Sequence, residues 1–259
     1  MIKWFVGAFV AIAIAERRHP LRRRVDPDAP RLIHNAAMAA ITAAITAALQ
    51  KPLVGRARHR GLLRRMNLPK PIRFIASILL LDYTLWWWHR LNHVAPPLWR
   101  FHLVHHIDRD LDVSTALRFH FGEMGLAAFF RAAQVRILGV DPDALVWWQR
   151  MLLVSILFHH SNLRLPENVE RELVRFIVTP RMHGIHHSQI EAETNSNWSS
   201  LFSWWDMLHG TFIYDEPQPV IGAPGWEDAE EPGLGSLLAI PFRRTPAPPR
   251  SRRSAPSVR

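Results

Sequence analysis

The sequence predicts an all-α integral membrane protein, a helical bundle built on about four apolar segments. Apolar runs recur along the 259-residue chain, arginines gather in the stretches beside them, and the eleven tryptophans stand at their ends. Tryptophan at headgroup level and arginine facing the cytoplasm are typical of membrane helices. We therefore expect a protein of the bacterial inner membrane or the endoplasmic reticulum.

The composition restricts both the chemistry and the partners. The chain has no cysteine, which excludes disulfides, thiolate-bound haem, iron–sulfur clusters and zinc–thiolate sites, so nitrogen and oxygen must hold any metal. The net charge is +10 with histidine neutral, and both nucleic acid and an anionic membrane face attract such a chain. Because the arginines flank apolar runs, we expect a membrane and no nucleic acid.

The first apolar segment, residues 2–15, is shorter than the ~20 residues that cross hydrocarbon upright. It resembles a signal peptide, with Ala13-Ile14-Ala15 as the cleavage site, or a retained anchor. The arginines of residues 16–24 favour a retained anchor, because they would hold that end at the cytoplasm.

The second apolar segment, residues 32–49, raises a conflict of topology. If it spans the membrane, the eight basic residues of 51–73 lie on the opposite side from those of 16–24. That arrangement opposes the positive-inside tendency. Either the segment re-enters the same face or the tendency is broken locally, and the sequence leaves both open.

Residues 72–88 form the clearest expected span, and a tryptophan triplet closes it just before His89. The prolines of residues 96–97 end this helix after His93. No crossing fits between the histidines on either side of these prolines, so both clusters lie on one face of the membrane.

Residues 122–138 and 144–158 are expected to form a full or shallow hairpin, with Asp141 as N-cap and Pro142 as first helical residue. The second helix ends at His159-His160. A hairpin would return the chain to the same face of the membrane. This is necessary if the histidines of residues 183–187 are to share a metal site with those before residue 107.

Three histidine clusters dominate the sequence. They contain His89 and His93; His102, His105 and His106; and His183, His186 and His187. On a helix, residues three and four apart share a face, so each cluster directs its imidazoles one way. A single histidine of this kind is more often a surface or core residue. Because neutral imidazole is a common metal ligand, the set predicts one or two bound metal ions.

Asp82 is a hypothetical orienter of His89, because it lies seven residues earlier on the same helical face. A carboxylate inside a lipid-embedded helix is costly without a partner, and carboxylates commonly orient metal-bound imidazoles. The alternative is a hydrogen bond to another helix.

Eight imidazoles are too many for one four-coordinate zinc, and a zinc hydrolase usually needs a carboxylate base near the metal. Two redox-active irons at a membrane face suggest O2 activation and attack on a lipid C–H bond. The alternatives are a membrane metal-binding or transport protein without catalysis and a zinc-dependent membrane hydrolase. Transport sites usually lie at mid-bilayer on broken helices, whereas these clusters follow the ends of apolar segments.

Residues 1–235 are expected to form one membrane-bound catalytic domain. Residues 236–259 are rich in proline and arginine and are expected to be a disordered basic tail.

Residues 82–215, about half of the chain, resemble the fatty acid hydroxylase/sterol desaturase superfamily of histidine-box di-iron membrane enzymes. The matching words, in chain order, are D-Y-x4-W-x-HRxxH, LWRFHxVHH, D-x-ST-x-x-RFH, FHHSN, TPRMHxIHH, and N-x-NW leading to WWDMLHGT. The order and spacing of these sequence motifs make the resemblance specific, more than any single motif does.

The resemblance implies that the eight histidines of the three clusters are metal ligands. It adds His160 as a ninth ligand, with His159 as its neighbour. His120 matches the histidine of the family's RxHPxE word and is a further candidate ligand, although Phe121 replaces the proline. Glu123 keeps the acidic position and, with Asp82, is expected to support the ligands. His209, His19, His34 and His59 are expected not to bind metal.

The resemblance also implies a helical cap that holds the metals at the cytosolic face of the bundle. Its cofactor would be two iron ions, with zinc as a substitute in purified protein. Its partners would be a lipid substrate, O2 and a separate electron-donor protein of cytochrome b5-like or ferredoxin type, because no flavin or nicotinamide motif is present. Hydroxylation and desaturation both fit, with a slight preference for hydroxylation.

Overall fold

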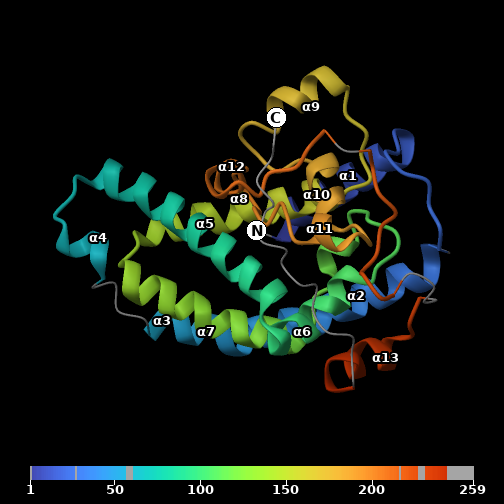
Figure 1. Cartoon of the computed structure of the whole chain (residues 1–259). Coiled ribbons are helices and arrows are strands. Elements are labelled where there is room, and N and C mark those ends of the chain that lie inside the picture. The colour runs from blue at the N-terminus through green and yellow to red at the C-terminus, as the bar shows by residue number, and fades with distance from the viewer. Residues whose placement is uncertain (1, 27, 57–60, 216, 227–230, 244–259) are drawn as a thin grey trace.

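The computed structural model describes the chain except residues 1, 27, 57–60, 216, 227–230 and 244–259. Within this part the regular structure is helical, and strand pairing is limited to isolated bridges. The predicted all-α class is therefore confirmed. Helices α5 (Lys70–Val94) and α7 (Phe121–Leu138) extend side by side towards α4 (Leu62–Arg65), and short helices gather at the other end (Figure 1).

The long helices are α1 (Ile2–Arg18), α2 (Asp28–Ile45), α5 (Lys70–Val94), α6 (Pro96–His106), α7 (Phe121–Leu138) and α8 (Pro142–His160). The short helices are η1 (Thr46–Gln50), α3 (Lys51–Arg56), α4 (Leu62–Arg65), η2 (Thr115–Leu117), α9 (Glu167–Leu173), α10 (Pro180–His186), α11 (Glu191–Thr194), α12 (Trp204–His209), α13 (Leu234–Ala239) and η3 (Ile240–Phe242). We call the end formed by α9 to α12 the cap.

Proline and glycine set the ends of the helices that carry the site. Helix α5 ends at Val94, because the following Ala95 is extended (φ −95°, ψ 112°) before two prolines. Helix α7 ends at Leu138, because the following Gly139 has a φ of 63°, in the left-handed region. The Asp141 side chain then caps α8 and Pro142 occupies its first turn, as predicted.

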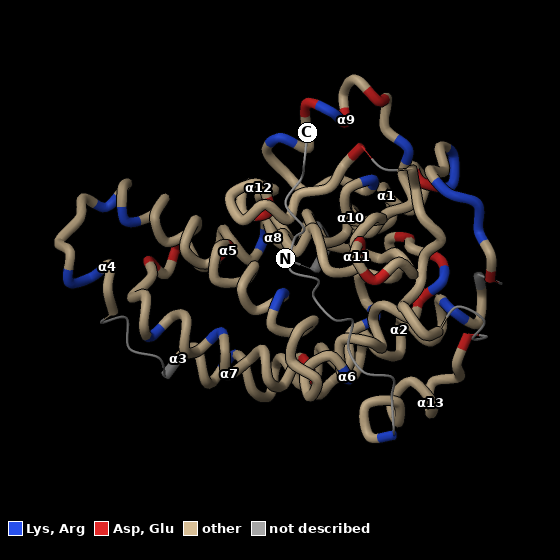
Figure 2. The backbone as a smooth tube through the Cα atoms, in the orientation of Figure 1, with Lys and Arg blue, Asp and Glu red and all other residues tan. Residues whose placement is uncertain are grey.

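Helices α2, η1 and α3 follow one another from Asp28 to Arg56, and the chain does not reverse within residues 32–49. It turns back near α4, so the basic residues around α4 lie at the end opposite the cap (Figure 2). Among the described residues, only Ala29–Gly55 is long and apolar enough to cross a membrane. The other predicted segments are helical but do not share this combination of length and composition.

The bundle core joins α5, α7 and α8 through Leu81, Val135 and Trp148. A second core joins α2 and α6 to α13 and η3, where Leu237 and Ile240 are buried. The packed part of the chain therefore continues past the domain boundary predicted at residue 235. Residues 244–259 lie outside the described residues.

Candidate metal centre

Four helices bring nine buried histidines to one place beneath the cap. They come from the end of α5, from α6, from the end of α8, and from α10 and the residue that follows it, His187. One potential ligand nitrogen of each approaches its neighbours to form two groups, with the nitrogens in each group within 4.8 Å of one another. The five-histidine group is His89, His93, His102, His106 and His186, and the four-histidine group is His105, His160, His183 and His187.

The five-histidine group is held by fixed acceptors on the outer side of its rings. Nδ1 of His89 lies 2.7 Å from the Trp198 carbonyl oxygen, and Nδ1 of His186 lies 2.7 Å from that of Ser196. A carbonyl oxygen can only accept, so each Nδ1 carries the hydrogen and each neutral ring turns its Nε2 lone pair inward. These two Nε2 atoms are 3.1 Å apart.

Two lone pairs that face each other at this distance do not form a hydrogen bond. His102 repeats the arrangement, because its Nδ1 lies 3.0 Å from a Glu123 carboxylate oxygen and its Nε2 lies 3.2 Å from that of His89. The arrangement is stabilised only if a cation lies among the lone pairs. Such outer acceptors are typical of metal-bound histidines, where they fix the tautomer and the ring orientation.

The four-histidine group has the same convergence with less support. Nε2 of His160 lies 3.0 Å from those of both His105 and His183, and its Nδ1 lies 2.8 Å from the Ile156 carbonyl oxygen. Nδ1 of His105, His183 and His187 has no hydrogen-bond partner in the described part of the chain. The two groups adjoin, since the rings of His106 and His187 stack with centroids 4.3 Å apart.

Burial lowers the pKa of eight of these rings and keeps them neutral. It lowers the pKa of His186 to about 3, against a smaller opposing contribution from the Ser196 carbonyl. Burial and then the neighbouring His93 lower the pKa of His106 well below its usual 6.5. Neutral imidazole is the form that binds metal, so these eight rings need no deprotonation near neutral pH.

The buried nitrogens without partners also fit a metal. Both ring nitrogens of His93, His106 and His187 are buried and make no hydrogen bond with the described residues. Leaving such groups unsatisfied is costly, and a bound ion would satisfy one nitrogen of each ring. With nine imidazoles in two groups, the residues fit two metal ions better than one.

The structure separates the remaining candidate histidines from both groups. The His120 side chain accepts from the Gly122 amide and caps α7, while its Nε2 lies 3.3 Å from the Leu238 carbonyl oxygen. His159 is buried beside His183, with ring centroids 4.1 Å apart, but supplies no nitrogen to either group. We therefore leave both out of the proposed ligand set.

His209 stacks on Trp86 and reaches Tyr83. His19 is exposed, and His34 lies 3.4 Å from Glu231. His59 lies outside the described residues.

Asp82 does not orient His89, so that hypothesis is wrong. Its two oxygens accept hydrogen bonds from the indoles of Trp148 and Trp205 and from the Phe202 amide. Asp82 and His89 share a face of α5, but two helical turns separate them by about 10 Å along the helix axis, which is too far for a hydrogen bond. The carboxylate instead joins the cap to the bundle, which is the alternative of a hydrogen bond between helices.

Asp206 supports the site in a way that the sequence did not reveal. It accepts hydrogen bonds from the Trp198 and Ser199 amides and from the Trp86 indole. It therefore fixes the loop whose Ser196 and Trp198 carbonyls hold two ligands. Backbone acceptors leave no pattern in a sequence, although Asp206 itself stands in the WWDMLHGT word.

An apolar cavity of about 600 Å3 opens beside both histidine groups. His89, His102, His105, His160 and His183 line one part of it. Aromatic and aliphatic side chains from α1, α2, α5, α7 and α8 line much of the rest, including Phe5, Leu85, Trp88, Phe130 and Ile156. Cavities of this size and character are typical of ligand sites.

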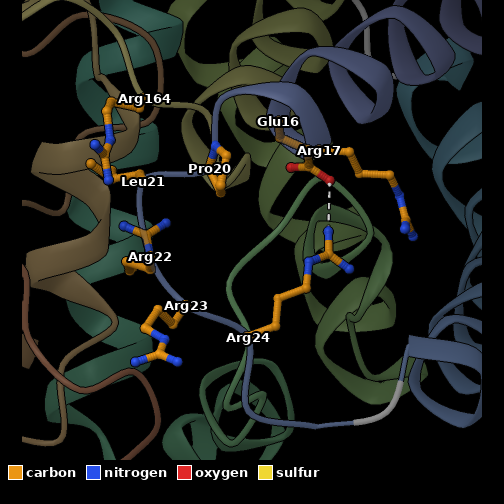
Figure 3. A pocket seen from close by; sticks show the side chains of 8 residues that line it. All are labelled: Glu16, Arg17, Pro20, Leu21, Arg22, Arg23, Arg24 and Arg164. Carbon is orange, nitrogen blue, oxygen red and sulfur yellow. Dashed lines mark ion pairs between the residues drawn. The ribbon is translucent and has the colours of Figure 1, made fainter.

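A basic pocket of about 470 Å3 lies where the chain leaves α1 (Figure 3). Its lining is Glu16, Arg17, Pro20, Leu21, Arg22, Arg23, Arg24 and Arg164. Arg22 donates hydrogen bonds from the pocket to the carbonyls of Ser161 and Pro180. The Arg22 guanidinium and the Gln218 side chain lie against α10 at Gly184, where a Cβ would meet both of them.

Comparison of the sequence with known proteins identifies a family for the part of the chain that carries the histidines. A sequence model of the fatty acid hydroxylase family matches residues 74–211. Ornithine lipid hydroxylase OlsE of Rhizobium tropici is 30% identical over 176 residues, which are 68% of this chain and 52% of that protein. Alkylglycerol monooxygenase of Homo sapiens is 27% identical over 161 residues, 61% of this chain and 35% of that protein.

Cholesterol 25-hydroxylase of Mus musculus is 30% identical over 140 residues, 53% of this chain and 45% of that protein. The chain thus spans about half or less of the length of these relatives. No solved structure matches it.

Proposed function

Because the chain belongs to the fatty acid hydroxylase family, we propose that it is a membrane-bound di-iron oxygenase that uses O2 to hydroxylate an unactivated C–H position of a lipid. The observation that carries the proposal is the pair of buried histidine groups whose Nε2 lone pairs converge beside an apolar cavity. The relatives named above are hydroxylases and monooxygenases, which favours hydroxylation over desaturation.

The chain's residues would hold, orient and shield the centre. Iron, when bound by the nine histidines, would supply the O2 activation that no amino-acid side chain can provide. The Ser196 and Trp198 carbonyls and Glu123 fix three of the rings. The apolar cavity would bring a lipid chain beside the histidines and keep bulk water away from the reacting carbon.

Hydroxylation also sets the electron balance. Conversion of a C–H bond and O2 to an alcohol and water consumes two electrons and two protons. The chain has no cysteine for an iron–sulfur cluster and no flavin or nicotinamide motif, so we propose a separate donor protein of cytochrome b5-like or ferredoxin type. The basic pocket around Arg22 is a suitable face for an acidic donor, because it lies next to the four-histidine group.

Membrane attachment is part of the same proposal. The stretch Ala29–Gly55 supplies one helix suited to span the bilayer. Exposed aliphatic residues on α1, such as Val6, Val10 and Ile14, suit a lipid-facing helix. We propose that the cap faces the cytoplasm, because residues 16–24 carry arginines at that end of the molecule.

Oxygen-isotope labelling tests the proposal. The full-length protein, reconstituted with iron, a chemical reductant and membrane lipid extract, is expected to consume O2 and to convert a lipid to a product heavier by one oxygen atom. Under 18O2 that atom should be labelled. A metal-binding or transport protein would show no substrate-dependent uptake. A zinc hydrolase would hold tightly bound zinc and incorporate oxygen from water.

A further inference from the structure

The cavity beside the histidines contains a buried cation in its wall. Arg131 lies on α7 and is only 9% exposed. Glu123, on the same helix, contacts His102. Arg131 lies eight residues after Glu123, so Arg131 and Glu123 are about 12 Å apart along the helix axis. The cavity therefore has a metal-binding part and, further along α7, a part with a positive charge.

Arg131 has little that would neutralise it. It donates a hydrogen bond to the neutral Gln134 side chain, and its guanidinium lies 4.1 Å from the centroid of the Trp148 ring. Among the described residues no carboxylate forms an ion pair with it. Asp82 attracts Arg131 electrostatically but forms no ion pair with it, and the Asp82 oxygens accept hydrogen bonds from two indoles and a backbone amide instead.

A buried guanidinium that no carboxylate contacts directly is costly for the fold, and proteins normally pair such a group. The cavity gives a ligand access to it. An anionic oxygen group could accept two parallel hydrogen bonds from the guanidinium fork, which is a strong and directional interaction. Lys51 and Gln50 line the same cavity and would add to its preference for a negative group.

The lining between the two parts is apolar. Ala127 and Phe130 of α7, with Leu152 and Ile156 of α8, contribute to it. A hydrocarbon chain is the ligand that such a lining favours. The ligand class is therefore an amphiphile with an anionic group at one end.

We propose that Arg131 binds the anionic group, a carboxylate or a phosphate, of a lipid whose hydrocarbon chain extends along the cavity to the histidine groups. Arg131 thereby selects anionic over neutral lipids and sets how far along the chain the reacting carbon lies. This inference rests on the proposed function for the identity of the reacting end, but its binding step does not require metal.

Equilibrium binding tests the selection. In a neutral detergent, palmitic acid, hexadecyl phosphate and hexadecanol compete with the fluorescent fatty acid cis-parinaric acid for the full-length protein. The wild type is expected to bind the acid or the phosphate about tenfold or more tightly than the alcohol, the size expected for a charge-assisted hydrogen bond. The ranking of acid and phosphate distinguishes a free fatty acid from a phospholipid as the source.

Three variants assign the effect to Arg131. Arg131→Gln is expected to bind the acid and the alcohol almost equally, and Arg131→Lys should retain part of the preference. Arg136→Gln removes an exposed charge of the same helix and should match the wild type. Probe affinity cancels within each ratio, and the detergent partitioning of the acid and the alcohol, measured without protein, is the same for every variant.

Equal binding of acid and alcohol by the wild type would overturn the inference and leave the hydroxylase proposal intact. A preference that persists in Arg131→Gln would also overturn it. If that variant does not fold, the wild-type ratio and Arg131→Lys decide. Failure of the wild type to bind any of the three amphiphiles would reject both this inference and the lipid substrate.

Discussion

The two histidine groups differ in how firmly their rings are held. In the five-histidine group, three rings turn Nδ1 to a fixed oxygen, supplied by Trp198, Ser196 or Glu123. In the four-histidine group only one ring does so, through the Ile156 carbonyl. The other three Nδ1 atoms of that group have no partner in the described part of the chain.

This difference has a thermodynamic consequence. Outer acceptors fix ring orientation before the metal arrives, so less ordering remains to be done on binding. The five-histidine group should therefore hold its ion more tightly. The four-histidine group should be more easily emptied and more adaptable in geometry, which suits the position next to the proposed donor face.

Removing one ligand from each group should have the largest effect. His186→Ala and His183→Ala are both expected to lower turnover by about hundredfold or more, because each destroys one half of the centre. Their metal contents should differ. His183→Ala should retain about one ion per chain, and His186→Ala should retain less after gel filtration, as measured by mass spectrometry of the metal.

The exposed His19 supplies the matched control, since His19→Ala should keep the wild-type metal content. Equal metal loss in His183→Ala and His186→Ala would contradict the difference between the groups.

Chelation should separate the two ions in time. We expect metal to leave the wild type in two phases, with the faster phase roughly tenfold faster, the lower end of the range for outer-acceptor effects. His183→Ala should show only the slow phase. A single phase that removes both ions together would indicate that the groups are equally organised.

Loss of the Glu123 carboxylate should weaken the better-held group. Glu123→Gln is expected to lower metal affinity or turnover by about tenfold to hundredfold, because a neutral amide holds the His102 Nδ1–H less strongly than a carboxylate does. The exposed Glu191→Gln serves as control. An unchanged metal affinity in Glu123→Gln would remove Glu123 from the supporting set.

Asp82 should affect the fold and leave the metal centre intact. Asp82→Asn cannot satisfy all three donors that the carboxylate accepts, and loss of such buried hydrogen bonds costs about 1–3 kcal/mol of unfolding free energy. Denaturant unfolding measures the loss. Metal content at low denaturant should match the wild type, whereas a large loss of metal would restore Asp82 as a ligand orienter.

The smallest effect concerns Glu16, next to the four-histidine side of the molecule. Burial, and then repulsion from Asp112, raise its pKa from 4.5 to about 7. Between about pH 5 and pH 7 the unfolded chain has already lost this proton while the folded protein keeps it, so the contribution of Glu16 to stability falls as pH rises. Glu16→Gln should therefore gain stability relative to the wild type between about pH 5 and pH 8. Unfolding midpoints that change in parallel would contradict this.

The sequence predicted the ligands far better than it predicted their supports. Histidines three and four residues apart can be recognised as joint ligands from the sequence, because this spacing places them on one face of a helix. His160 was identified because it lies in a sequence motif shared with the family, and the structure places it among the other eight histidine ligands. Glu123 was also identified through such a word, and it contacts His102.

The supports were harder to predict, because they depend on contacts between distant segments. The Ser196 and Trp198 acceptors are backbone carbonyls, which every residue has. Asp82 shares a face with His89 yet turns to the cap. His120 matches a ligand word but caps α7, in a stretch where Phe121 replaces the usual proline. Tertiary packing decided each of these cases.

The most direct test of the account is the iron content and Mössbauer spectrum of protein expressed with 57Fe and purified without chelator. The account predicts about two irons per chain with mainly nitrogen ligands, magnetically coupled when oxidised and unequal in their quadrupole splitting, as two differently supported histidine groups require. One iron per chain, or two uncoupled irons with the same quadrupole splitting, would contradict it.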